Sequence, residues 1–494
     1  MFPSKKRSFL FTLCLALIFS YNTGHARQTD AALPPNGDAF ARAYAAAIQA
    51  GDVARRQHLF KNAQGQAEVV AHFMYNQGIT LLKSGDLSGA QFNLINALDL
   101  FNRLRMGDSV AKVLAALAST YESKPDARSI LPIYEAALKI MRRLGNKEGE
   151  VDNLGLIAHF HRRTENYAEA IAYAQTALDV VKMVPNPVKK AVVRNNLGQI
   201  KRESGDYAGA LSLFKEALTI AGKFSSWDTK AWILKNIGRL HQSAGDYKMA
   251  DGFYKQALPM MIDFGNKLGE GQVLSGLGYI SWKQGDDEAA LLYLNRAGKV
   301  FSRIKNEPGL GEVNLFSAHI FRENGHYKRA GEAYNIAHSY YEKAGLLQEE
   351  AEASHAHGEV LLVIGEYEDA ANSFKNALEV YRKIDDSAAL AETQAYLAEA
   401  FHRIGHYKKS ITSIKSALSI ARVAKNRSAV IRNLNKLGEI YLNTGDYSLA
   451  LKNFKLAEGI SKKHGTQLQN LSIIKNIATT YGQIGDAKRE RSNY

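Results

Sequence analysis

Histidine and glycine residues are the first candidates for a catalytic or binding site, because they supply metal ligands, general bases and phosphate-binding loops. His159 and His161 are two residues apart, as are His355 and His357, so on a helix the members of each pair point to different sides. A zinc-binding helix instead places its histidines four residues apart. The Gly-Leu-Gly sequence at residues 276–278 lies inside a predicted helix and follows no strand. We therefore expect no enzyme activity, no metal site and no cofactor.

The only cysteine, Cys14, lies in a segment with the layout of a secretory signal. Residues 1–7 carry three positive charges, residues 9–19 are apolar, and small residues occupy the positions before a cleavage point after Ala26. Residues 1–26 are therefore predicted to be a signal peptide, and the mature chain to be exported to the periplasm or the extracellular space. An uncleaved membrane anchor is the alternative. The mature chain would hold no cysteine, which excludes disulfides and thiolate metal sites.

The net charge is +14, from 63 lysines and arginines against 49 acidic residues. Such an excess can attract nucleic acid, anionic membranes or acidic proteins. The basic residues are spread along all 494 positions rather than clustered. A solubilising surface is the favoured interpretation, and nucleic-acid binding is not expected because no stacking platform is recognisable.

The elements that position these residues follow a period of forty. Glycines recur at this interval from Gly205 to Gly485, and alanines recur at it without a break. A fixed period of this size predicts a solenoid, in which each unit buries its apolar face against its neighbours. The alanines are Ala97, Ala137, Ala177, Ala217, Ala257, Ala297, Ala337, Ala377, Ala417 and Ala457.

Each unit is predicted to be a helix pair, with a first helix ending before the glycine and a second beginning after it. Residues 188–204 and 207–223 show this, with apolar residues at three- and four-residue spacing. A small residue, such as Gly198, occupies one site of every first helix and marks where the two helices cross. The glycine at the turn, such as Gly205, supplies backbone freedom at a helix C-terminus.

This combination resembles the tetratricopeptide repeat in its longer, forty-residue variety. The resemblance rests on a small residue, a glycine seven positions on, a tyrosine nine on, and the Ala210, Phe214 and Ala217 pattern of the second helix. It implies an all-α fold, a right-handed α-solenoid of antiparallel helix pairs. We expect about ten repeats over residues 67–486 with a last unpaired helix near 467–484, after a leader and capping helices at 27–66 and before a tail at 487–494.

In tetratricopeptide repeat proteins the first helices line a concave groove that binds peptides. Carried onto this chain, the resemblance implies a groove whose amides pair with a peptide backbone and whose arginines grip carboxylates. The candidates are Asn195, Asn196, Gln199, Arg202, Lys235, Asn236, Arg239, Tyr279, Trp282, Lys283 and Arg322.

Two sets of glutamates repeat further along the chain and predict an acidic stripe. One set comprises Glu312, Glu352 and Glu392, near predicted helix starts, where acids also interact favourably with the helix dipole. The other comprises Glu359, Glu399 and Glu439, seven residues along the same face. Together with the basic candidates, these positions suggest a groove that is basic in the middle and acidic towards the C-terminus.

The function expected from these features is that of a non-enzymatic, exported adaptor or scaffold that binds a protein or peptide segment in its groove. The alternative is a regulator that senses a peptide or small ligand and changes its superhelical curvature on binding. A sensor input for a fused output domain is a further possibility, which the few residues after the last predicted helix disfavour.

Overall fold

The computed structural model describes residues 43–44, 46–47, 50, 52–62, 64–84, 86–120 and 131–492. Within these ranges all regular structure is helical and no strand occurs. The chain forms two compact units, Met1–Asp246 and Tyr247–Tyr494. The predicted signal peptide lies outside the described residues, as does most of the predicted leader.

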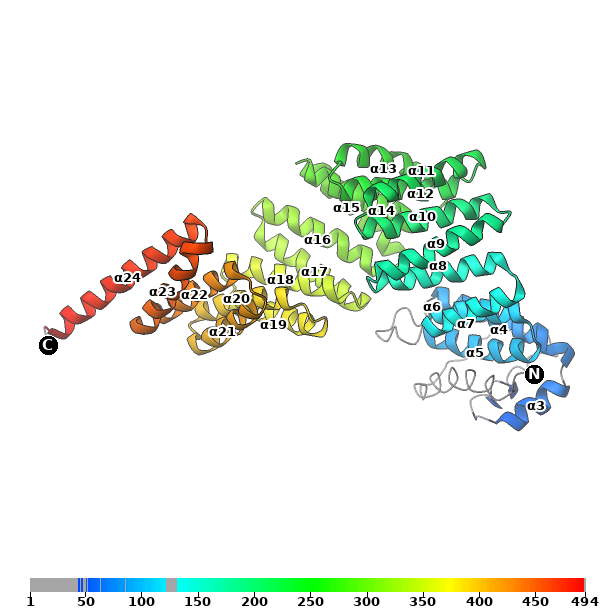
Figure 1. Cartoon of the computed structure of the whole chain (residues 1–494), viewed down its shortest axis with the longest axis horizontal. Coiled ribbons are helices and arrows are strands. Elements are labelled where there is room, and N and C mark those ends of the chain that lie inside the picture. The colour runs from blue at the N-terminus through cyan, green and yellow to red at the C-terminus, as the bar shows by residue number, and fades with distance from the viewer. Residues whose placement is uncertain are drawn as a thin grey trace. The chain divides into compact units, whose positions relative to one another are not determined.

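The helices of the first unit are stacked in sequence order (Figure 1). A short 3₁₀ turn, Val181–Met183, precedes α10. The helices are α3 (Val53–Asn62), α4 (Gln64–Ser84), α5 (Leu87–Arg103), α6 (Gly107–Ser119), α7 (Leu131–Leu144), α8 (Lys147–Arg163), α9 (Tyr167–Val180), α10 (Pro187–Glu203), α11 (Tyr207–Lys223) and α12 (Trp227–Ser243).

The second unit continues the same alternation of helices. Its elements are α13 (Tyr247–Asp263), α14 (Lys267–Lys283), α15 (Asp287–Arg303), α16 (Glu307–Glu323), α17 (Tyr327–Ala344), α18 (Leu347–Ile364), α19 (Tyr367–Lys383), α20 (Ser387–Ile404), α21 (Tyr407–Val423), α22 (Arg427–Asn443), α23 (Tyr447–His464) and α24 (Gln467–Ser492). The even-numbered helices are the predicted first helices. Each packs on the helices next to it along its unit, which confirms the all-α solenoid.

The turns form as the glycine spacing predicts. Gly205 and Gly405 adopt φ values of 88° and 86°, a left-handed conformation that other residues reach only with strain. After the first of these turns, the Asp206 carboxylate accepts a hydrogen bond from the backbone N–H of Gly209 and caps α11. The turn therefore ends one helix and starts the next within three residues.

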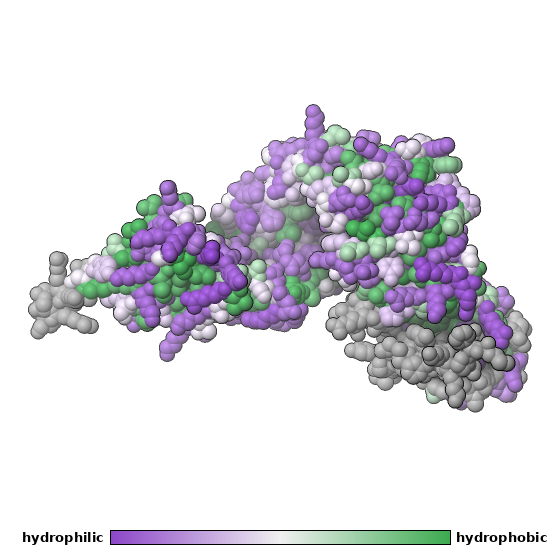
Figure 2. All heavy atoms as spheres, viewed as in Figure 1, coloured by the Kyte–Doolittle hydropathy of each residue, from purple (hydrophilic) through white to green (hydrophobic). Residues whose placement is uncertain are grey.

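The core is built at the crossing of each helix pair. All ten repeated alanines are buried. A Cβ atom added at Gly198 would come within 2.7 Å of the Phe214 ring, and one at Gly358 within 2.7 Å of the Phe374 ring. The small residue of the first helix thus makes room for an aromatic ring of the second, which confirms the predicted crossing. Figure 2 shows hydrophilic residues over much of the drawn surface, with patches of hydrophobic residues among them.

One expected turn does not form. Gly485 lies inside α24, which runs unbroken from Gln467 to Ser492, so the expected helix end near Ile484 is wrong. Residues 487–492, expected to form a tail, are part of this helix. None of the described helices combines the length and apolar character that a membrane crossing requires.

Candidate functional site

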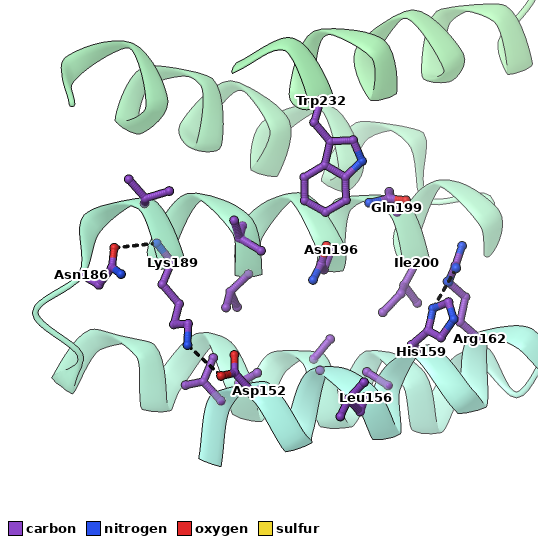
Figure 3. A pocket seen from close by; sticks show the side chains of 18 residues that line it. Asp152, Leu156, His159, Arg162, Asn186, Lys189, Asn196, Gln199, Ile200 and Trp232 are labelled. Carbon is purple, nitrogen blue, oxygen red and sulfur yellow. Dashed lines mark hydrogen bonds and ion pairs between the residues drawn. The ribbon is translucent and has the colours of Figure 1, made fainter. Parts of the chain in front are cut away.

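A cavity of about 710 Å³ opens in the first unit between α8, α10 and α12 (Figure 3). Leu156 of α8, Ile200 of α10 and Trp232 of α12 contribute apolar surface. Asn196 and Gln199 of α10 also line it. All three helices are predicted first helices of their repeats, and Ala174 and Ala177 of the second helix α9 also line the cavity.

The two amides of α10 are the polar groups best placed to meet a ligand. Asn196 and Gln199 are three residues apart, so their side chains lie on neighbouring turns of one helix face. Both are half-buried, and no hydrogen bond to another residue occupies either amide within the described chain. An amide in this state can donate one hydrogen bond to a peptide carbonyl and accept one from a peptide N–H.

Asn195 and Asn236 lie elsewhere, and their expected place outside the core is wrong. Asn195 is fully buried, and Asn236 is 3% exposed. The Asn236 Nδ2 donates a hydrogen bond of 2.9 Å to Asn195 Oδ1, which links α12 to α10. A buried amide is costly without a partner, and Asn236 supplies one for Asn195 Oδ1, whereas Asn195 Nδ2 is buried with no hydrogen-bond partner among the described residues. Neither side chain lines the cavity.

Basic residues gather near the C-terminal ends of α8, α10 and α12. Arg162, which lines the cavity, and Arg202 both donate to Glu203 Oε1, at 2.9 and 2.8 Å. Burial, together with the charges of Arg239 and Arg202, lowers the pKa of Lys235 to about 8. Arg239 is exposed. This end of the face therefore carries excess positive charge, which favours an acidic group on a ligand.

Several cavity residues were missed by sequence reasoning, among them Trp232, Leu156 and Lys189. A signal was present for the first, because Trp232 lies forty residues after Val192, which precedes Asn196 by four residues on the cavity-facing side of α10. Lys189 is oriented by Asp152, whose Oδ2 atom lies 2.8 Å from its Nζ. No local pattern indicates that pair, because its members belong to different helices.

Aromatic side chains gather on α14 and α16 in the second unit. Trp282 packs on Tyr279 with ring centroids 5.7 Å apart and stacks on His319 at 5.6 Å. The Trp282 indole N–H donates to Glu323 Oε2 at 2.7 Å, and Lys283 Nζ lies 3.5 Å from the indole centroid. Tyr279 and Trp282 are thus partly buried in a cluster rather than free on a groove surface.

The glutamates predicted as an acidic stripe are largely paired with cations. Arg322 Nη1 lies 3.3 Å from Glu359 Oε2. Glu399 contacts both Arg403 and Lys436. Burial opposes ionisation of Glu399, but the hydrogen bonds from these two cations outweigh it and hold its pKa below the usual value.

The remaining members of the stripe include one paired glutamate and two exposed ones. Lys436 Nζ also lies 3.3 Å from Glu439 Oε2. Glu352 and Glu392 are exposed. Glu392 lines a second cavity of about 460 Å³ between α20 and α22, where Arg432 and Lys436 also lie. Glu359, Glu399 and Glu439 are thus paired with cations, whereas Glu352 and Glu392 are exposed, and the acidic stripe stays a prediction.

Polar contacts between successive first helices follow two spacings. Pairs 41 residues apart include Arg162–Glu203, Asn195–Asn236 and Trp282–Glu323. Pairs 37 residues apart include Asp152–Lys189, Arg322–Glu359 and Glu399–Lys436. Among the residues that the structure describes, no cluster of three histidine, cysteine or acidic side chains could hold a metal ion.

Family models for the tetratricopeptide repeat match residues 150–223, 229–303, 349–423 and 431–464. Together the matches span just over half of the chain. The chain is a tetratricopeptide repeat protein. The assignment agrees with the helix pairs and crossing sites described above, and it confirms the resemblance to the tetratricopeptide repeat; the forty-residue variety stays a prediction.

The solved structures to which this tetratricopeptide repeat protein is similar include the following three. BtubC from P. vanneervenii has 19% identity, with 44% of this chain and 92% of that chain covered and a TM-score of 0.40. The Rap protein complexed with competence and sporulation factor has 16% identity, with 71% of this chain and 99% of that chain covered and a TM-score of 0.48. The quorum sensor NprR from B. thuringiensis in its apo form has 14% identity, with 70% of this chain and 98% of that chain covered and a TM-score of 0.46. No curated protein sequence matches significantly.

Proposed function

We propose that this tetratricopeptide repeat protein is a non-enzymatic adaptor that holds a segment of another protein against its first helices. The observation that carries the proposal is the cavity between α8, α10 and α12. It combines an apolar wall with two amides that no other residue occupies. Export to the periplasm or extracellular space, with residues 1–26 as a cleaved signal, is part of the proposal.

In this proposal each part of the cavity contacts a different part of the bound segment. Trp232 and Leu156 would contact an apolar side chain of the bound segment, which loses its water on entry. Asn196 and Gln199 would pair with the segment's backbone, a contact that tolerates many sequences. The basic end around Arg202 would favour an acidic residue on the same segment.

A phage-displayed library of random peptides tests the proposal. Peptides selected on the wild-type protein should contain an apolar residue next to an acidic one. Their affinity, measured by calorimetry, should fall at least ~10-fold with Trp232→Ala, since burying an aromatic side chain contributes about 1.5–3 kcal/mol. Asn196→Ala should weaken binding to a smaller extent.

Thr219→Ala is the matched control, because the Thr219 hydroxyl is exposed on α11 and bonds only to its own helix, at Lys215 O. It should leave binding unchanged. The proposal fails if no peptide is enriched, or if Trp232→Ala and Thr219→Ala bind the selected peptides equally well.

A second candidate is a sensor of a short peptide, favoured by the size of the cavity. A volume of about 710 Å³ lies within the range of small-ligand sites and would enclose only a few residues. Subcellular fractionation with N-terminal sequencing separates the candidates. An exported chain starting near Arg27 supports the adaptor, whereas an intact chain in the cytoplasm supports the sensor.

A further inference from the structure

Helix α24 displays a row of apolar and small side chains on its exposed face. Leu471 is 64% exposed, Ile474 is 49% and Tyr481 is 50% exposed. Ala478 and Gly485 lie between and beyond them, also exposed. The intervals along Leu471, Ile474, Ala478, Tyr481 and Gly485 are three, four, three and four residues, which places all five on one side of the helix. We call this row the α24 stripe.

The corresponding residues of α22, forty positions earlier, are covered. Ile431 and Leu434 are each 1% exposed, and Tyr441 is 8% exposed. Gly438, the counterpart of Ala478, lies directly against the Phe454 ring of α23. The α24 stripe is therefore the face that a second helix covers in the preceding repeat, and within the described chain no second helix covers it.

The rest of α24 is firmly docked, so the direction of the stripe is set by packing. Ile473 is buried in the same core as Leu434 and Phe454. Asn476 Nδ2 donates to Asn435 Oδ1 at 3.0 Å and to Glu439 Oε1 at 3.1 Å, both on α22. Figure 1 shows α24 continuing past the ends of α22 and α23.

We propose that the α24 stripe binds the α24 stripe of a second copy of this chain, with the two helices antiparallel. Apolar residues at alternating intervals of three and four form the seam of a two-helix pair. Leu471, Ile474, Ala478 and Tyr481 are symmetric about the level of residue 476, midway between Ile474 and Ala478. A two-fold axis at that level would place Ile474 opposite Ala478 of the second copy, and Leu471 opposite its Tyr481.

The length of the α24 stripe favours a second copy of α24 as its partner over a helix placed as α23 is on α22. In the preceding repeat the covered face ends at Tyr441, because the chain turns at Gly445, which has a φ of 79°. The α24 stripe continues through Gly485, the position of that turn, because the helix itself continues to Ser492. A partner that covers the whole stripe must run past the turn position too, as a second α24 does.

Light scattering coupled to size-exclusion chromatography of the full-length chain measures the pairing. The wild type should form a concentration-dependent dimer. The double variant Leu471→Glu/Ile474→Glu should raise the dissociation constant at least ~100-fold, because two side chains that bury apolar area in the dimer become charged. Ser472→Glu, an exposed position beside the stripe, is the matched control and should leave the dimer intact. Circular dichroism verifies that all three proteins remain helical.

A cysteine scan tests the symmetry, because Cys14 is the only cysteine in the sequence. In a Cys14→Ser background, mixing Ile474→Cys with Ala478→Cys should give an intermolecular disulfide under mild oxidation, since the axis places these two positions of different copies opposite each other. Mixing Ile474→Cys with Thr479→Cys, one residue away, should not. A wild type that stays monomeric up to its solubility limit overturns the proposal. So does a dimer that resists Leu471→Glu/Ile474→Glu, or a disulfide that Ile474→Cys forms with position 479 and not with position 478.

Discussion

Three asparagines show how one residue type serves two purposes in this molecule. Asn196 lines the cavity with its amide unoccupied, whereas Asn195, its neighbour in sequence, is buried and hydrogen-bonded to Asn236 at 2.9 Å. On a helix, the side chains of consecutive residues point about 100° apart, so Asn196 can face the cavity while Asn195 points into the core. Removing Asn236 would leave a buried amide unsatisfied. A loss of ligand binding in an Asn236 variant would therefore indicate a destabilised fold and not the loss of a direct contact with the ligand.

His319 leads to a prediction about pH. Its ring stacks on Trp282, and its Nδ1 lies 2.8 Å from the Tyr334 hydroxyl. Burial, together with Arg322 and Lys283, lowers the pKa of His319 from 6.5 to about 4. The unfolded chain therefore binds more protons than the folded chain between these values, and stability falls as the pH drops through them.

At pH 5 this group should cost about 2 kcal/mol of unfolding free energy relative to neutral pH. Urea unfolding at pH 7 and pH 5 measures the loss, and His319→Gln should show a smaller loss by about that amount. Burial also lowers the pKa values of His355 and His357, but these groups contribute equally to both proteins. Equal losses in wild type and variant would contradict the role given to His319.

At the scale of the helix pair, a small residue on one helix and a ring on the other determine the packing distance. Gly198 meets Phe214 at the crossing, and Ala217 is fully buried one turn further along α11. Such sites tolerate little added volume, because interiors are packed at the density of organic crystals. The forty-residue alanine register is thus a steric requirement repeated in every pair.

Ala257 of α13 tests this requirement. Ala257→Phe should lower the free energy of unfolding by at least ~1–3 kcal/mol, the cost of overpacking a core site that is 0% exposed. Gln256→Phe adds the same ring at an exposed neighbouring position and should change stability far less. Urea denaturation of both variants measures the difference. Equal stability of the two would contradict the placement of the alanine register in the core.

At the scale of the whole molecule, stability is local, because each helix packs mainly on its neighbours along the chain. Two compact units result, divided between Asp246 and Tyr247. Hydrogen bonds between first helices, such as those at spacings of 41 and 37 residues, also join only successive repeats. Among the described helices, these contacts join neighbours or successive repeats, so one part of a unit can pack without the rest of the chain.

Native-state hydrogen exchange should reveal this locality. Ala417→Phe, at a fully buried site in α21, should speed amide exchange in α20 to α23 and leave α8 to α11 unchanged. Mass spectrometry of peptic fragments gives the comparison. Exchange that accelerates equally in α8 to α11 would show that the chain unfolds as one cooperative unit instead.

The sequence alone determined the architecture, because the same steric demand recurs every forty residues and can be read from glycine and alanine positions without knowing any distance contact. It also determined which helices carry the candidate groove. Only the tertiary structure decided which polar residues face it. Asn195 differs from Asn196 by rotation about the helix axis, and Asn236, at the repeat position of Asn196, is buried against a partner 41 residues away. For the same reason the pairing of Glu359 and Glu399 with cations of other repeats, and the continuation of α24 through Gly485, emerged only from the packed helices.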